Sequence, residues 1–213
     1  MNREDQVKAY AFADFEEPHN LFIQTFQEKF ADIHPSFNDV VLDLGCGPCD
    51  ITRRFAKAYP DAGFHAIDGS ATMLKYAKEL NEKEKLTIRI KLVESSLPEA
   101  ELPQSLYHTI ISNSLLHHLN DPFSLWNTIK KHAKPFAHIF LMDLIRPVDE
   151  QTVTFLSNEY AATEPDILKA DFENSLRAAY TAKEVRMQID KAGLGNLEIE
   201  EISDRHMIIY GVL

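Results

Sequence analysis

Short hydrophobic runs alternate with segments of helical periodicity over residues 39–143. The runs have the length and composition of buried strands, whereas the segments between them repeat their apolar positions every three or four residues. Such alternation is typical of a parallel sheet with helices on both faces. The predicted strands are 39–44, 63–67, 87–93, 107–112 and 136–143, with helices at about 50–58, 70–80 and 121–132.

Residues 1–38 precede the first strand and have a helical pattern. Leu21, Phe22, Phe26 and Phe30 recur at helical spacing, and Pro18 suits the first turn of a helix that ends near Phe30. This N-terminal helical cover either lies over a ligand site or packs against the sheet edge, and the sequence favours neither.

A second helical segment interrupts the alternation after the fifth strand. Residues 147–180 predict two helices, at about 149–162 and 165–179, which we interpret as an insertion over the carboxyl ends of the strands. Thr181 and Glu184 then have the spacing of a capping box, which predicts a helix start, and Gly193 follows the predicted end near Ala192.

Two closing strands, at about 197–202 and 206–211, are separated only by Ser203-Asp204-Arg205. So short a connection predicts an antiparallel hairpin. The sequence therefore predicts an α/β fold with a doubly wound, Rossmann-like sheet, mostly parallel with an antiparallel C-terminal hairpin strand. No linker or repeat divides the chain, so we expect residues 1–213 to form a single domain.

Composition narrows the classes of partner. The 213 residues include 45% hydrophobic and 26% charged side chains, which is normal for a globular protein. The net charge of −11 disfavours nucleic acid, because phosphate contacts supply most non-specific affinity for it. No apolar run is long enough to span a membrane, and two closely spaced cysteines fit a reducing compartment, so we expect a cytoplasmic protein. The oligomeric state is not predicted.

The end of the first strand carries the strongest chemical signal. Val40-Val41-Leu42-Asp43-Leu44 leads into Gly45-Cys46-Gly47-Pro48-Cys49-Asp50, which opens a helix. A glycine turn between a strand and a helix brings backbone N–H groups close to a ligand. A carboxylate at the strand end, Asp43, favours a ligand that carries a cation or an amine.

The same turn allows three other interpretations. A dinucleotide-binding turn requires G-x-G-x-x-G, but Asp50 occupies its last position. Cys46-Gly47-Pro48-Cys49 matches the tetrapeptide of a thiol–disulfide oxidoreductase, with both thiols near a helix N-terminus. The third interpretation is a tight turn that binds nothing.

Asp68 ends the second strand 25 positions after Asp43 and precedes Gly69-Ser70-Ala71-Thr72-Met73-Leu74. A carboxylate there can accept hydrogen bonds from both hydroxyls of a ribose. Its alternative role is to cap the following helix. Met73 either packs on a nucleoside or fills the core.

Together with Leu116-His117-His118-Leu119-Asn120-Asp121-Pro122 after the fourth strand, these segments resemble the signatures of class I S-adenosylmethionine (SAM) dependent methyltransferases. The third glycine of the first signature is replaced by Cys49, and an Asp common after the third strand is replaced by Ser95-Ser96. The resemblance implies that the chain transfers a methyl group from SAM to a small organic acceptor. It implies cofactor contacts from Asp43, Gly45, Cys46, Gly47, Asp68, Gly69, Met73, Ser95, Ser96 and Asn113.

The resemblance also places His117 beside the acceptor, where an imidazole can take a proton, so we predict it to be catalytic. A structural histidine is the alternative. The adjacent His118 suggests a metal, but neighbouring residues rarely reach one ion, and no metal is predicted. After the fifth strand, Arg146 either binds an anionic acceptor or pairs with a carboxylate such as Asp143 or one in the insertion.

We expect residues 1–16 and 147–180 to roof the acceptor site. Their aromatic side chains suit a small organic molecule, with Tyr10 as a substrate contact. Two other functions stay open: a thiol–disulfide oxidoreductase using Cys46 and Cys49, and a SAM-binding protein without catalysis. The predicted roof aromatics are Tyr10, Phe12, Phe155, Tyr160, Phe172 and Tyr180.

Overall fold

The computed structural model describes residues 4–13, 15–33 and 37–213. Seven strands form one sheet in the order β3-β2-β1-β4-β5-β7-β6. The first five run parallel, whereas β7 is antiparallel to both β5 and β6, as the hairpin predicts. The strands are β1 Val40–Leu44, β2 Gly63–Asp68, β3 Ile90–Glu94, β4 Tyr107–Asn113, β5 Ala133–Leu144, β6 Glu198–Glu201 and β7 His206–Val212.

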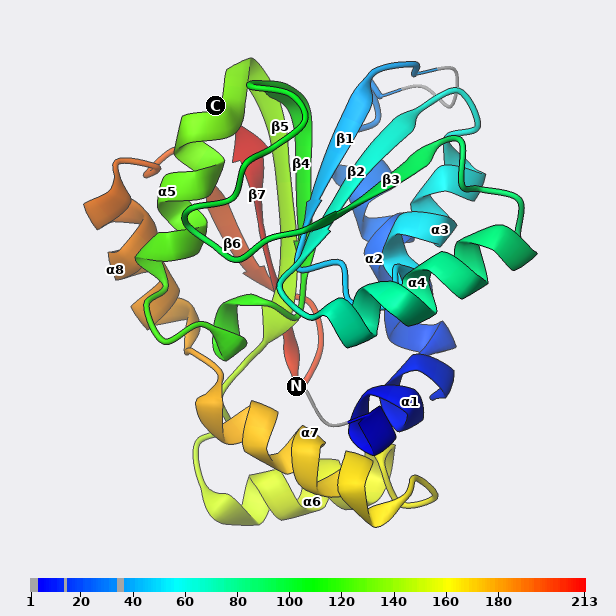
Figure 1. Cartoon of the computed structure of the whole chain (residues 1–213). Coiled ribbons are helices and arrows are strands. Elements are labelled where there is room, and N and C mark those ends of the chain that lie inside the picture. The colour runs from blue at the N-terminus through cyan, green and yellow to red at the C-terminus, as the bar shows by residue number, and fades with distance from the viewer. Residues whose placement is uncertain (1–3, 14, 34–36) are drawn as a thin grey trace.

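Helices cover both faces of this sheet (Figure 1). On one face α2 (Glu16–Lys29), α3 (Asp50–Ala58) and α4 (Ala71–Lys83) bury a cluster rich in phenylalanine. On the other face α5 (Phe123–His132) and α8 (Ala182–Ala192) pack around Trp126. The predicted α/β, doubly wound class is confirmed.

Three further helices lie at the end of the sheet where the parallel strands finish. They are α1 (Glu4–Phe12), α6 (Glu150–Tyr160) and α7 (Asp166–Ala178), drawn together below the sheet in Figure 1. The short helix η1 (Leu116–His118) follows β4 and contacts α7. The two segments that are predicted to form the roof meet where α1 contacts α7. Residues 1–3 and 14 of the first segment lie outside the described residues.

Element boundaries differ from the sequence pattern in three places. The third strand starts at Ile90 rather than 87, because Leu86–Arg89 forms a turn with Arg89 N–H donating to the Leu86 carbonyl. The fifth strand starts earlier, at Ala133, where it pairs with Tyr107 across a register shift. Helix α5 starts at Phe123, whose N–H donates to the Asp121 carboxylate 3.0 Å away.

Other local predictions are confirmed. The capping box at the start of α8 makes both of its hydrogen bonds: the Thr181 hydroxyl accepts the Glu184 N–H, and the Glu184 carboxylate accepts the Thr181 N–H. Gly193 ends that helix in the left-handed conformation. No described helix is long and apolar enough to cross a membrane.

Candidate functional site

A cavity of about 380 Å³ lies at the carboxyl ends of β1, β2, β3 and β4. We call it the first cavity. Each of the ten residues predicted to contact a cofactor lines it, so residues from four segments of the sequence converge on one space. They are Asp43, Gly45, Cys46, Gly47, Asp68, Gly69, Met73, Ser95, Ser96 and Asn113.

Glycine is required in the turn after β1 for steric reasons. Gly45 has φ +75°, and a Cβ there would lie 2.7 Å from the Leu115 side chain. The Gly45 N–H donates to the Ile67 carbonyl at 2.8 Å, which fixes the turn against the end of β2. Gly47 has φ +52°, and nothing lies within 4 Å of the position of its Cβ. The turn is therefore tight toward the protein and open toward the cavity.

Asp68 joins this turn to helix α4. Its carboxylate accepts the Gly47 N–H at 2.9 Å and the Ser70 N–H at 2.8 Å. Burial raises its pKa, although both hydrogen bonds oppose the change. Ser70, not Asp68, is the N-cap of α4, since its hydroxyl accepts the Met73 N–H; Asp68 holds the backbone of that N-cap residue, and its carboxylate faces the first cavity.

Asp43 is almost completely buried at the end of β1. Burial raises the pKa of this carboxyl to about 7, against the hydrogen bond that it accepts from the Thr52 hydroxyl at 2.5 Å. A buried carboxylate is costly without a positive partner. Since Asp43 lines the first cavity, a ligand carrying an ammonium group would offset that cost.

The two cysteines have the wrong environment for thiol–disulfide chemistry. Cys46 and Cys49 are free and buried. Burial, followed by the neighbouring Cys49 and the Asp43 and Asp68 carboxylates, raises the pKa of Cys46 well above its ordinary value. Redox thiols instead need a lowered pKa, because the thiolate is the nucleophile. Cys49 sits at the start of α3 with φ 63°, in the place of a third glycine.

The far side of the first cavity is formed by α1, α4 and the end of β3. Met73 is buried against Val7 of α1 and Tyr76 of α4. Across from it, a Cβ on Gly69 would lie 2.8 Å from the Ser96 hydroxyl oxygen. This side therefore combines an apolar surface with hydroxyl groups.

A second cavity, of about 570 Å³, lies beside the first, between the carboxyl ends of β4 and β5 and helices α2, α6 and α7. Apolar side chains such as Leu144, Leu168 and Phe172 line part of it. The two cavities share seven lining residues, so they meet. The shared residues are Tyr10, Ala13, Phe15, His19, Asn113, Ser114 and His118.

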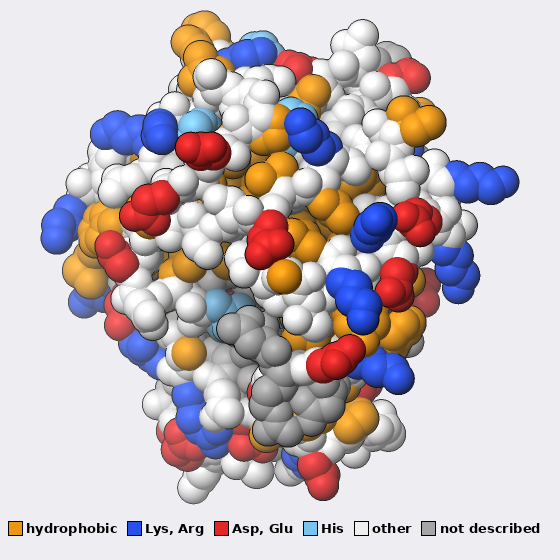
Figure 2. Space-filling model, viewed as in Figure 1, with side chains coloured by type: hydrophobic (Ala, Val, Ile, Leu, Met, Phe, Trp, Pro, Cys, Tyr) orange, Lys and Arg blue, Asp and Glu red, His pale blue; other side chains and the backbone are white. Residues whose placement is uncertain are grey.

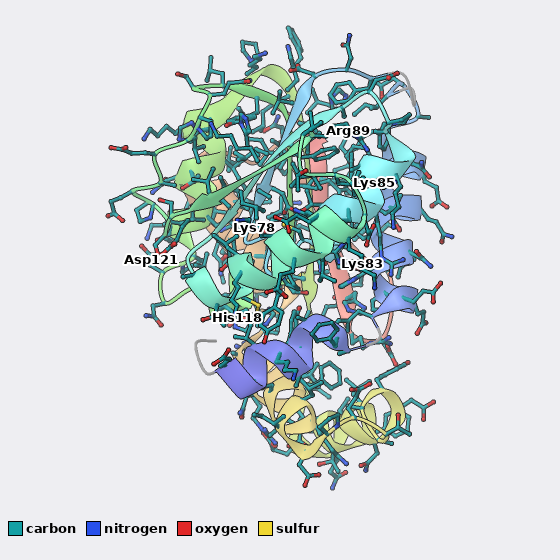
Figure 3. The ribbon with its side chains drawn as sticks, turned by 45° about the vertical axis from the view of Figure 1, so that its right-hand side comes forward. Lys78, Lys83, Lys85, Arg89, His118 and Asp121 are labelled. Carbon is teal, nitrogen blue, oxygen red and sulfur yellow. The ribbon has the colours of Figure 1, made fainter. Side chains whose placement is uncertain are left out.

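Two histidines of η1 stand at different depths in this region. The Nδ1 atom of buried His117 lies 2.6 Å from the Asp143 carboxylate, which also accepts the Leu116 N–H. His117 lines only the second cavity, whereas His118 lines both. The two rings are 4.1 Å apart. Figure 3 places His118 directly above α1.

The structure places several predicted acceptor contacts elsewhere. Tyr10, Tyr160 and Phe172 line the second cavity, but Phe12, Phe155 and Tyr180 do not. Phe12 and Phe155 are mostly exposed, because helical spacing alone does not determine which helix face meets the sheet. Tyr180 instead forms a β-bridge with Ile145.

Arg146 lines neither cavity, so the geometry gives no support to its predicted substrate contact. Its guanidinium donates to Glu184 at 2.6 Å and to the Ala179 carbonyl at 3.3 Å. Arg205, which the sequence reasoning missed, is the arginine of the second cavity. It stacks 3.3 Å from the Tyr160 ring centre and pairs with Asp204 at 3.0 Å. Its place in a three-residue turn gave no local signal.

Histidines from two other elements also escaped the sequence analysis. His19 of α2 lines both cavities and lies 2.6 Å from Asp50, whose pKa is lowered by His19 and Arg54 despite burial. His206 of β7 lines the second cavity. Among the described residues, no group of three or more His, Cys, Asp or Glu is placed to hold a metal ion.

Charges of both signs are spread over the outer surface. On the face shown in Figure 2, lysine and arginine side chains alternate with aspartate and glutamate, and apolar side chains show between them. No broad basic surface stands out on that face.

The chain is similar to known methyltransferases. Residues 41–136 match the family model described as a methyltransferase domain. A malonyl-[acyl-carrier protein] O-methyltransferase of Bacillus cytotoxicus is 32% identical over 81 residues, 38% of this chain and 27% of that protein. A probable fatty acid methyltransferase of Pseudomonas putida is 32% identical over 120 residues, 54% of this chain and 30% of that protein. The chain thus spans less than a third of the length of these two curated relatives.

The fold has close counterparts among solved structures. A SAM-dependent methyltransferase from Aquifex aeolicus aligns with a TM-score of 0.71 over 100% of this chain and 99% of its own, at 19% sequence identity. At that identity the likeness concerns the fold alone. It extends beyond residues 41–136 to the helices at both ends.

Proposed function

We propose that the chain is a class I SAM-dependent methyltransferase, as its sequence resemblance implies, and that it transfers the methyl group of SAM to a small organic acceptor. The observation that supports this proposal is that a cavity formed by the strand ends and the glycine turn meets a second, partly apolar cavity at seven shared residues. The cofactor occupies the first cavity and the acceptor occupies the second.

The residues of the first cavity suit the three parts of SAM. Asp68 accepts the ribose hydroxyls, which adds to its backbone contacts. Asp43 pairs with the ammonium of the methionine part, and the open side of Gly47 lets that part approach the backbone. Met73, Ser95 and Ser96 surround the adenine. SAM supplies an activated methyl group when bound.

The protein's own contribution is orientation and exclusion of water. Helix α1 joins the two cavities: Val7 packs on Met73 of α4, and the Gln6 amide lies 2.7 Å from the Asp171 carboxylate of α7. The N-terminal cover and the 147–180 insertion therefore act together as the roof of the acceptor site. His117, held by Asp143, is the predicted catalytic histidine.

Labelled methyl transfer tests the proposal. Purified protein is incubated with radiolabelled SAM and a small-molecule extract, and labelled products are separated. Transfer to a small organic molecule supports the proposal. A protein that binds S-adenosylhomocysteine (SAH) tightly but methylates nothing would be the non-catalytic alternative.

The oxidoreductase alternative has a separate readout. An oxidoreductase would reduce a disulfide substrate and lose that activity in a Cys46→Ser, Cys49→Ser variant. The environment of Cys46 opposes it. A cytoplasmic location and the exclusion of nucleic acid stay predictions from composition.

A further inference from the structure

The place where the two cavities meet carries an unpaired hydrogen-bond acceptor. The Asn113 side-chain oxygen is buried at the end of β4 and has no hydrogen-bond partner among the described residues. Leaving such a group unpaired costs about 1–3 kcal/mol. Since Asn113 lines both cavities, a ligand at their junction is placed to supply the missing donor.

His118 supplies a second acceptor at the same junction. Its ring contacts His117, and no hydrogen bond joins it to the described residues. Its side chain is exposed to both cavities. Desolvation inside the cavities, followed by repulsion from His117, lowers the pKa of His118, so the ring offers a nitrogen lone pair at neutral pH.

The surrounding charges are mostly negative. Among the described residues, four carboxylates line the second cavity, and Arg205 is the only arginine that does. Burial lowers the pKa of His206 to about 4, so this ring adds no positive charge. Such a lining attracts a cation and repels an anion. The four carboxylates belong to Glu16, Glu17, Glu164 and Asp171.

We propose that the acceptor is a small organic amine, whose two N–H groups donate to the Asn113 side-chain oxygen and the His118 ring nitrogen. The inference rests on the proposed methyl transfer and names its substrate class. When both N–H groups donate to these acceptors, the nitrogen lone pair makes no hydrogen bond and can point toward the methyl group of SAM. An acceptor molecule with a carboxylate head group would instead be repelled by the lone pairs of Asn113 and His118 and by the acidic lining.

The proposed step balances without a catalytic base. The acidic lining draws in the ammonium form of the amine, which first releases one proton to water. The neutral amine nitrogen then forms a bond to the methyl carbon, and the carbon–sulfur bond breaks with its electron pair remaining on sulfur. The products are a methylated ammonium ion and SAH. His118 and Asn113 touch the reacting nitrogen. His117, which the sequence predicts to be catalytic, acts in this step as a positioning residue instead, through its contact with His118 and its bond to Asp143.

Three probes with the same phenyl body separate the head groups: 2-phenylethylamine, 2-phenylethanol and 3-phenylpropanoate. SAH binding is measured first by calorimetry, and each probe is then tested with SAH-loaded protein by NMR and with labelled SAM. We expect the amine to bind and to be methylated at least about tenfold better than either other probe, the value of one paired hydrogen bond.

The variants Asn113→Leu and His118→Phe each remove one acceptor. Leucine has about the size of asparagine, and phenylalanine keeps a ring that can stack on His117. Each should lower amine methylation about tenfold. SAH affinity should stay nearly unchanged in His118→Phe, because His118, unlike Asn113, is not one of the predicted cofactor contacts. Asn113→Asp, which keeps oxygen acceptors, should retain the amine preference and serves if the leucine variant fails to fold. His138→Phe, in the middle of β5 and outside the lining of both cavities, is the matched control.

The variant His117→Phe distinguishes a positioning role of His117 from a purely structural role. It should raise the NMR-measured pKa of His118, because the repulsion from His117 that lowers this pKa is removed, and lower kcat more than it raises the KM for the amine. Preference for the alcohol or carboxylate, binding of none of the probes, or loss of SAH affinity in His118→Phe would overturn the inference. Failure of the wild type to bind SAH would instead sink the proposed function.

Discussion

The first cavity is shaped by backbone, whereas the second is shaped by side chains on helices. In the first, Gly45 and Cys46 donate their N–H groups to Ile67, and Asp68 accepts those of Gly47 and Ser70. In the second, the walls are held by long-range pairs such as Gln6 with Asp171 and Tyr160 with Arg205. A backbone turn admits few substitutions, but a helical roof can change with the acceptor.

Gly45→Val should have the largest effect, because it places a side chain in the tight backbone turn that forms the first cavity. The added Cβ would lie within 2.7–2.9 Å of Leu115 at φ +75°, and overpacking alone costs about 1–3 kcal/mol. We expect a lower melting temperature and no measurable SAH binding. Gly47→Ala is the matched control, because its Cβ meets no neighbour and only its φ of +52° opposes it. Equal losses of melting temperature in both variants would contradict the steric argument.

Asp68→Ala removes a side chain that serves turn and cofactor together. Loss of paired hydrogen bonds to a charged group should cost about 1.5–3 kcal/mol, or roughly 10- to 150-fold in SAH affinity by calorimetry. Asp68→Asn keeps one acceptor oxygen and should lose less. Unchanged affinity in the alanine variant would remove Asp68 from the ribose contact.

Asp43→Asn tests the cost of the buried carboxyl. Because the folded-state pKa is raised to about 7, the folded protein holds a proton that the unfolded chain releases near pH 4. Wild-type stability should therefore fall as pH rises from about 4 to about 7, by at most about 4 kcal/mol, and stay low above that.

The asparagine variant should lack this decline, so it should be more stable than wild type above pH 7 yet bind SAH more weakly. Denaturant unfolding across this pH range measures the first effect. A parallel decline in both proteins would show that Asp43 is not its source.

Gln6→Ala probes the roof of the second cavity. It removes the contact between α1 and α7, which is partly exposed, so we expect a loss of about 1 kcal/mol or less. The KM for an amine should rise several-fold at nearly unchanged SAH affinity, and amides of residues 4–13 should exchange faster. Gln151→Ala, on the exposed side of α6, is the control.

Hydrogen exchange also tests the roof in the wild type. Protection should rise in residues 4–13 and 147–180 when SAH and amine are both bound. Identical exchange with and without ligands would leave both segments as structural packing.

The Cys46→Ser, Cys49→Ser variant should have the smallest effect. The turn depends on its backbone geometry, and both cysteines are free and buried. SAH affinity should change by less than about tenfold, or 1.4 kcal/mol. Complete loss of binding in a folded variant would reveal a role for the thiols.

The contrast between the cavities also explains what the sequence could predict. Asp43, Gly45 and Asp68 lie at strand ends, and the ends of parallel strands converge by topology, so local motifs locate the first cavity. Arg205 and His206 reach the second cavity through hairpin and helix packing, which no local period encodes. The same limit applies to Arg146 and Tyr180, whose partners Glu184 and Ile145 lie far away in the sequence.

Calorimetric titration of the wild-type protein with SAH tests the central claim most directly. The account predicts one site per chain with a micromolar dissociation constant, about −8 kcal/mol, and loss of that binding in Gly45→Val. Absence of binding by folded wild-type protein at millimolar SAH, or equal binding by folded Gly45→Val, would contradict the assignment of the first cavity.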